Sequence, residues 1–181
     1  MPYVKSGGVL FVKSKNTWMI FLTILLCSCG YRFSGSGTFP ESVEYIFIEV
    51  FENQTSKTGA ERTVTNQVIF EFTRQRERSL ANSPEEADAI LKGVIRNITT
   101  NTISRVDYEV ASEREVVMTI DVKLIKKGGE VIWSAKGLSD RQAYDVTQFG
   151  KTENDRNEDV AIARISERLS ERVFNRLTDN F

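Results

Sequence analysis

The side chains that most often perform acid–base, nucleophilic or metal chemistry are sparse in this chain of 181 residues. It contains no histidine and only two cysteines. The missing histidines exclude histidine-dependent catalytic triads and histidine metal sites. Carboxylates gather around residues 85–88 and 155–159, where acids commonly accompany the start of a strand or helix. Neither group has the companions of a catalytic acid pair or a calcium loop, so we expect a protein that is not an enzyme and has no metal or cofactor.

The first chemistry that the sequence does predict involves its N-terminal region. Residues 18–26, WMIFLTILL, form a short apolar segment that follows three lysines, Lys5, Lys13 and Lys15. A helix needs about 20 apolar residues to cross a bilayer, so this segment is too short to span one. A basic region followed by a short apolar region and small residues is typical of a secretory signal.

The next residues, LCSCG, predict that the signal ends in a lipidated cysteine. They resemble a bacterial lipobox in which Cys29 is modified, whereas Cys27 does not fit because Leu26 would then occupy the position of a small residue. We expect a signal peptide over residues 1–28 and a mature chain anchored through acyl chains on Cys29. Gly30, rather than an aspartate, follows the cysteine and favours the outer membrane. The alternative is an ordinary secretory signal with incidental cysteines.

The rest of the chain has the composition of one globular domain. Hydrophobic residues make up 40% and charged residues 27%, which suits a chain that buries a core. The net charge of -1 gives no basic field, so we expect no nucleic-acid partner. Glycine, serine and aromatic residues dominate residues 29–41, which we interpret as a lipidated tether, and the domain should occupy residues 42–181.

Hydrophobic periodicity predicts the elements of this domain. Strict alternation at residues 114–127 indicates a strand with one buried and one solvated face, and Gly128 and Gly129 then form a hairpin turn. Val64, Val68 and Phe72 recur at helical spacing, and Ile69 and Phe70 widen that stripe. The apolar side of the last helix contains Val160, Ile162, Ile165, Leu169, Val173 and Leu177. The predicted order is strand 43–51, helix 58–78, strands 87–103, 114–127 and 130–144, and a helix from residue 152.

These elements predict an α/β two-layer sandwich. The order β-α-β-β-β-α gives a four-stranded sheet, and the two amphipathic helices should cover one face of it. The first strand, helix and second strand form a crossover unit, so the first two strands should pair in parallel.

Four segments, in this order and spacing, resemble LptE, the lipopolysaccharide-assembly lipoprotein family. They are CGYRFSGSG at Cys29, IFIEVFENQT…GAE, ADAILKGVI and AYDVTQFGKTENDRNEDVAIARISERL. The resemblance implies two helices on a four-stranded sheet and a heterodimer in which the domain plugs the LptD β-barrel. It also implies a role in inserting lipopolysaccharide into the outer leaflet. The alternative is another envelope lipid-transport or assembly lipoprotein that has no barrel partner.

The resemblance further implies that basic residues contact lipopolysaccharide phosphates. In the predicted topology the second and fourth strands point the same way, so the loops after them, 104–112 and 145–152, should lie at one end of the sandwich. Arg105 and Lys151, one in each loop, are the main candidates for phosphate contact. Two further candidates flank the last strand, Lys136 and Arg141. The alternative for all four is an ordinary solvated surface charge.

Overall fold

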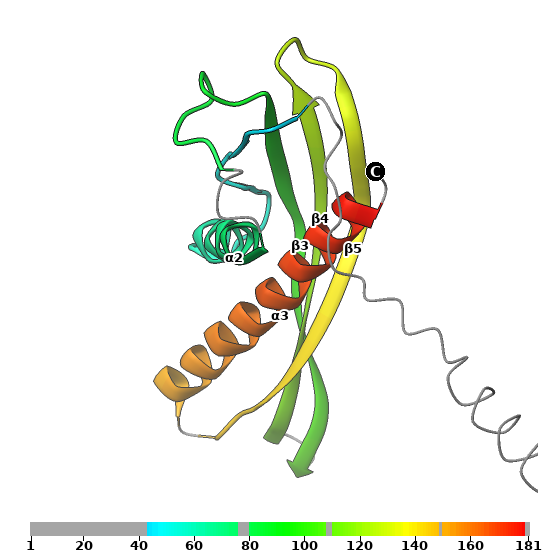
Figure 1. Cartoon of the computed structure of the whole chain (residues 1–181). Coiled ribbons are helices and arrows are strands. Elements are labelled where there is room, and N and C mark those ends of the chain that lie inside the picture. Colours follow the sequence, from blue (N-terminus) through cyan, green and yellow to red (C-terminus); the bar gives the residue numbers. More distant parts are fainter. Residues whose placement is uncertain (1–42, 76–79, 108–109, 149, 180–181) are drawn as a thin grey trace, which may run out of the picture. The chain divides into compact units, whose positions relative to one another are not determined.

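The computed structural model describes residues 43–75, 80–107, 110–148 and 150–179 (Figure 1). The predicted signal peptide 1–28, the tether 29–41 and Cys29 itself lie outside the described residues.

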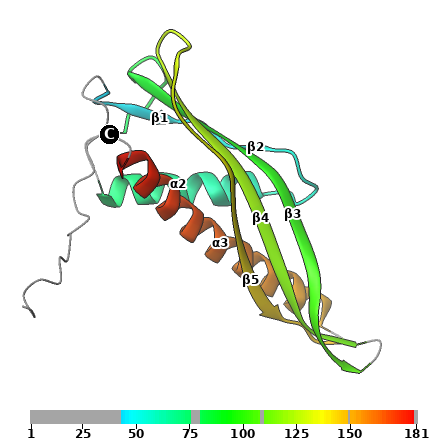
Figure 2. The ribbon, with the colours of Figure 1, turned by 90° about the vertical axis from the view of Figure 1, so that its right-hand side faces the viewer.

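Two helices pack on one face of a mixed sheet, which confirms the predicted α/β two-layer architecture (Figures 1 and 2). The sheet order is β1-β3-β4-β5, and β2 also pairs with β3. The strands β1 and β2 run parallel to β3, as the crossover predicts, and the other pairs are antiparallel. The elements are β1 Ile46–Ile48, β2 Glu52–Asn53, α2 Ala60–Gln75, β3 Ala89–Asp107, β4 Val110–Lys126, β5 Val131–Asp145 and α3 Lys151–Asp179.

The predicted first strand, 43–51, contains only β1, and a second short strand, β2, follows just beyond its predicted end, so the described sheet has five strands rather than four. Ile48 of β1 lies opposite Leu91, and pairing resumes where Glu52 of β2 lies opposite Val94. The first segment therefore has one more residue than β3 between the two pairs. Such an extra residue interrupts the ladder as a bulge does, and the sequence pattern of residues 43–51 does not reveal it.

Phe51 lies at this interruption and connects the sheet to α2. Its backbone N–H donates to Thr65 Oγ1 of α2 at 3.0 Å instead of joining the ladder. Its ring is only 2% exposed and lies directly over Gly93 of β3, where a Cβ atom would overlap the ring. Glycine at this position is thus what allows the aromatic ring to fill the core beside the strand.

Residues 104–112, for which the sequence left open a loop or an irregular strand edge, are largely irregular strand, so the loop reading used to place Arg105 is corrected. The β3–β4 ladder continues to the pairs Ser104 with Glu113 and Arg105 with Ala111, through several register shifts. These residues are polar and irregular in pattern, so alternation gave no strand signal. Pairing with a neighbouring strand satisfies their backbone groups, and this non-local contribution decides the conformation.

The core confirms the alternation predicted for β4. Gly128 and Gly129 have φ of 129° and 92° and form the predicted turn after this strand. The helix-facing residues of β4 are all buried: Val116, Met118, Ile120, Val122 and Leu124.

The helices bury narrower stripes than the sequence pattern predicts. In α2, Val64, Val68 and Phe72 are buried as expected, but Ile69 and Phe70 are 37% and 60% exposed. The residues spaced four apart already pack against both the sheet and α3. The flanking positions Ile69 and Phe70 therefore point toward solvent. On α3, Val160 is 44% exposed, whereas the other five predicted residues are buried. The helices meet through an edge-to-face contact of Phe72 with Phe174, with ring centroids 5.1 Å apart.

Candidate functional site

One end of the sheet brings together the chain segments that contain Arg105 and Lys151. Ser104 of β3 lies opposite Glu113 of β4, and Glu113 lies opposite Asp145, the last residue of β5. The ends of β3 and β5 therefore lie at the same end of the sheet, on either side of β4, as the topology predicted (Figure 2). Arg105 belongs to β3 itself rather than to a loop, which corrects its predicted setting.

Lys151 is the first residue of α3 and is exposed. The predicted loop 145–152 is therefore shorter, because β5 continues to Asp145 and the helix begins one residue early. Asn154 in the first turn of α3 holds this connection. Its Oδ1 accepts from Thr147 N–H and its Nδ2 donates to Thr147 O, both at 2.8 Å. This double hydrogen bond ties the first turn of α3 to the end of β5, and so positions the backbone at Lys151.

Lys136 and Arg141 lie within β5, not beside it, and both are exposed. Lys136 is at a bulge of β5, where the pairing with β4 shifts and Gly137 has a positive φ of 64°. Arg141 lies opposite Val117 of β4. Neither is at the sheet end that contains Asp145, so the four candidate cations do not form one cluster.

Lys136 instead belongs to a basic groove that the sequence analysis did not identify. We call it the outer groove, because its lysines alternate along the strands with buried residues that face α2 and α3; its volume is about 390 Å³. Its lining residues are Lys92, Val94, Arg96, Asp121, Val122, Lys123, Val131, Ser134 and Lys136. Alternation along β4 does indicate that Asp121 and Lys123 share the solvated face. The strand register that brings cations from three strands together leaves no local signal in the sequence.

The two acidic groups noted in the sequence have structural partners. Glu158 and Asp159 of α3 form ion pairs with Lys57, at 3.1 and 3.0 Å. Burial lowers the pKa of Lys57, but the hydrogen bonds to these carboxylates outweigh burial and raise the pKa above its usual value. In the other acidic group, Asp88 Oδ2 accepts hydrogen bonds from the backbone N–H groups of Glu44 and Tyr45, both at 2.9 Å. These backbone hydrogen bonds hold the pKa of Asp88 below its usual range.

No grouping of three or more metal-ligating side chains occurs among the residues that the structure describes. In the same part of the chain, every buried side-chain nitrogen or oxygen has a hydrogen-bond partner. The described domain therefore presents no unpaired buried polar group that would indicate a bound ligand inside its core.

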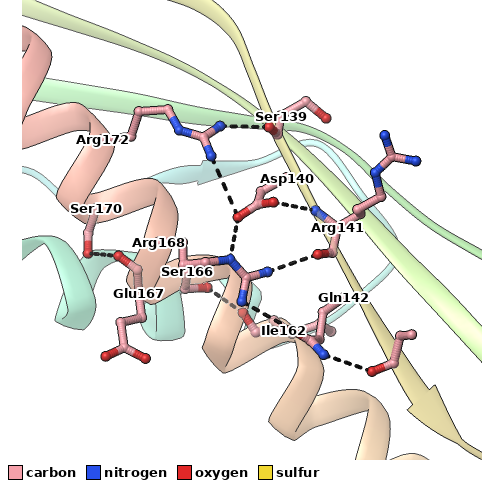
Figure 3. A network of polar contacts seen from close by, with 11 residues as sticks. Ser139, Asp140, Arg141, Gln142, Ile162, Ser166, Glu167, Arg168, Ser170 and Arg172 are labelled. Carbon is pink, nitrogen blue, oxygen red and sulfur yellow. Dashed lines mark hydrogen bonds and ion pairs between the residues drawn. The ribbon is translucent and has the colours of Figure 1, made fainter.

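A polar network fastens α3 to β5 (Figure 3). Arg168 Nε donates to Asp140 Oδ2 at 2.6 Å, and Arg172 lies 3.8 Å from the same oxygen. The N–H of Arg141 donates to Asp140 Oδ1 at 2.8 Å, while its guanidinium points away from the helix (Figure 3). Burial alone would raise the pKa of Asp140, but the hydrogen bonds from Arg168 and Arg141 and the two guanidinium charges lower it. The carboxylate therefore remains ionised at neutral pH.

Two arginines of this network and Asn157 also cover the outer edge of β5, which is an edge strand of the sheet. Backbone carbonyls at such an edge can accept hydrogen bonds from a foreign strand. Here Arg172, Arg168 and Asn157 of α3 donate to the carbonyls of three residues of β5, Ser139, Arg141 and Asp145, at 2.8–3.0 Å. These hydrogen bonds occupy carbonyls that a foreign strand would otherwise use, so strand addition along the second half of β5 is disfavoured.

Comparison with known families assigns this fold. The model of the family described as LptE, lipopolysaccharide-assembly, matches residues 43–177. The chain belongs to the LptE family. The match includes every described strand and both helices except the last two residues of α3. A search of curated proteins finds no match to this LptE family member.

Solved structures of two lipoproteins share the fold. Lipoprotein B of Nitrosomonas europaea superimposes with a TM-score of 0.56 and 11% identity, over 80% of this chain and 86% of that one. Rare lipoprotein B of Shewanella oneidensis gives a TM-score of 0.50 and 12% identity, over 74% of this chain and 95% of that one. At such low identity these likenesses support the fold alone.

Neither of the two described helices offers the apolar stretch that would be needed to cross a membrane.

Proposed function

We propose that this LptE family member is a non-enzymatic outer-membrane lipoprotein, anchored on the periplasmic side through acyl chains on Cys29. It plugs the LptD β-barrel, helps that barrel to assemble, and takes part in inserting lipopolysaccharide into the outer leaflet. The observation that carries this proposal is the match of the family model over residues 43–177. The lipobox-like residues before Cys29 supply the anchor.

Charge at the sheet end supports a contact with lipopolysaccharide phosphates. Arg105 and Lys151 belong to segments that meet there, and Lys151 is exposed. Lysine acts as a point charge toward phosphate, whereas arginine can form a two-pronged hydrogen bond with it. We assign the first phosphate contact to this pair, and weaker contacts to Lys136 and Arg141 on β5.

The covered edge of β5 bears on how the barrel would be engaged. Since α3 donates to the carbonyls of Ser139, Arg141 and Asp145, the domain would not extend the sheet of a barrel through this strand. A plug held by side-chain contacts inside a closed barrel agrees with such an edge.

Affinity purification of the tagged full-length lipoprotein from outer membranes in mild detergent tests the proposal. We expect a β-barrel of the LptD type in equal amount, identified by mass spectrometry, together with lipopolysaccharide. The intact mass of the purified protein should correspond to a chain that begins at an acylated Cys29. Elution of the protein alone, or with inner-membrane transport subunits, would contradict the plug and favour an envelope lipid-transport lipoprotein without a barrel partner.

Charge reversal at the sheet end tests the phosphate contact. In the double variant Arg105→Glu, Lys151→Glu we expect about fivefold less lipopolysaccharide per purified complex, because two proposed charge pairs of modest energy become repulsive. The amount of co-purified barrel should stay the same.

The control for this variant is Arg62→Glu, which reverses an exposed charge on α2, an element that carries neither Arg105 nor Lys151. It should retain wild-type lipopolysaccharide. Equal loss in both variants would mean that net charge, not the sheet end, governs the binding.

A further inference from the structure

The outer groove concentrates positive charge on a face that no other described element covers. Four of its nine lining residues are cations, and one is an acid. The neighbouring residues of β3, Leu91 and Ile95, are fully buried toward the helices, so Lys92, Val94 and Arg96 face the opposite side. The groove is therefore separate from the core and from the sheet end that contains Asp145.

The single acid of the groove is already engaged. Asp121 Oδ1 accepts the Gly137 N–H at 2.7 Å, and Oδ2 accepts Arg96 Nε at 2.8 Å. The hydrogen bond from Gly137 is the main reason that the pKa of Asp121 is lowered, and Arg96 adds to it. Asp121 thus stays ionised and balances Arg96, while its bond to Gly137 fixes the bulge that carries Lys136.

The three lysines of the groove are less well neutralised. Lys92 pairs with Glu49 at 2.6 Å, but both side chains are more than two-fifths exposed, so water weakens this pair. Lys123 and Lys136 form no hydrogen bond and no ion pair within 4.0 Å in the described part of the chain, although the charge of Asp121 also acts on Lys136 at longer range. Two ammonium groups are therefore available to an external anion.

The strand register forces these charges together. Lys92 lies directly opposite Lys123 across the β3–β4 pair, and Lys123 lies opposite Ser134 of β5. Like charges in directly opposed positions destabilise a sheet. A sheet face that served only as solvated surface would be more stable with opposite charges at this pair. An anion bound between the lysines would remove the repulsion.

The arrangement favours a compact anion of high charge. The lysines come from three adjacent strands and line one small groove, so they converge on one area. Arg96, the residue able to grip a planar carboxylate with two bonds, is occupied by Asp121. Free ammonium groups with a neighbouring hydroxyl, that of Ser134, suit the oxygens of a tetrahedral phosphate. Val94 and Val131 line the same groove and can contact the carbon part of an ester.

We propose that the outer groove is a binding site for a phosphate monoester, held by Lys92, Lys123 and Lys136 with the Ser134 hydroxyl. It is a second anion site, distinct from the sheet end of Arg105 and Lys151. The site itself follows from the groove alone, and only its use for a lipid-borne phosphate rests on the proposed function.

The test is a titration of the isotope-labelled full-length protein in dodecyl maltoside, followed by amide chemical shifts. Inorganic phosphate and glycerol phosphate should shift the amides around Lys92, Lys123 and residues 134–137. The double variant Lys123→Gln, Lys136→Gln should bind about tenfold more weakly, since two ammonium groups are removed. The matched control Arg156→Gln removes an exposed charge on α3 and should bind as the wild type does.

Two further arms separate the sources of the phosphate. Micelles doped with phosphatidic acid should compete with glycerol phosphate if the ester is carried by a lipid, and should not compete if the site takes a soluble ester. Either result supports the site. Absence of shifts in the groove, or equal affinity of the double variant and the wild type, would overturn it.

Failure of this site and failure of the proposed function give different results. Loss of barrel co-purification in the Lys123→Gln, Lys136→Gln variant, without any phosphate-induced shift, would identify the groove as a protein interface and overturn the anion site. Phosphate binding in the groove of a protein that co-purifies with no barrel would leave the site in place and remove the proposed function.

Discussion

Replacing Gly93 with alanine should lower the free energy of unfolding by about 3 kcal/mol, the upper part of the range for overpacked cores. The added Cβ would overlap the Phe51 ring, which is 2% exposed. The ring is buried in the core, and the Phe51 backbone N–H is held by Thr65, so relief of the overlap requires repacking around Phe51. Urea denaturation followed by circular dichroism measures the change.

A double-mutant cycle with Phe51→Leu distinguishes this clash from a general intolerance of strand residues. Phe51→Leu alone should destabilise the domain because it leaves a cavity. The double variant with Gly93→Ala should lose less stability than the sum of the two single losses, by about 1 kcal/mol or more. The reason is that the smaller side chain makes room for the methyl group. Additive losses, or a Gly93→Ala variant within about 0.5 kcal/mol of wild type, would contradict the proposed packing.

The Asp140→Asn substitution should lower the free energy of unfolding by about 2 kcal/mol at neutral pH, which is within the range for hydrogen bonds to charged groups. The carboxylate joins Arg168 at 2.6 Å and accepts the Arg141 N–H at 2.8 Å, with 16% of its side chain exposed. We place the loss below the maximum because Arg168 is 38% exposed and water screens part of the attraction. Equilibrium unfolding in urea provides the measurement.

The pH dependence of this loss has a defined sign. The pKa of Asp140 is lower in the folded protein than its ordinary value of 3.8, so the folded state favours the ionised form. The stabilisation is therefore complete above that value and is lost as the pH falls through the folded pKa. The difference between wild type and Asp140→Asn should be constant from neutral pH down to about pH 5 and shrink below about pH 4.

The control is Asp145→Asn, which removes an exposed carboxylate of the same strand that makes no ion pair with any described residue. It should change the stability by less than about 0.5 kcal/mol at any pH in this range. An equal loss in both variants would mean that the charge of β5, rather than its link to α3, determines the effect.

Local pattern predicted the elements where the chain alternates strictly or repeats at helical spacing. Burial on one face of β4 follows directly from the alternation at residues 114–127, because side chains on a strand point to opposite faces in turn. The same reasoning failed for Ile69 and Phe70, which are apolar yet exposed. How much of a helix is covered depends on which elements pack against it, and helical spacing contains no information on that.

The candidate site was predictable only as far as topology determines it. The order of the strands was enough to predict that the ends of β3 and β5 meet, and the register confirms it. Phosphate contact by Arg105 and Lys151 stays a prediction. The outer groove could not be predicted, because Lys92 and Lys123 are 31 residues apart and face each other only through one particular strand register.

The sequence by itself determined the fold class, the family and the absence of histidine chemistry, because these depend on residue types, their order and local periodicity. Only the tertiary structure decided where the first strand breaks, which strand edge α3 covers and which cations share a groove. Each of these depends on pairing between distant segments, where one extra residue, as at Phe51 or Gly137, changes which side chains meet.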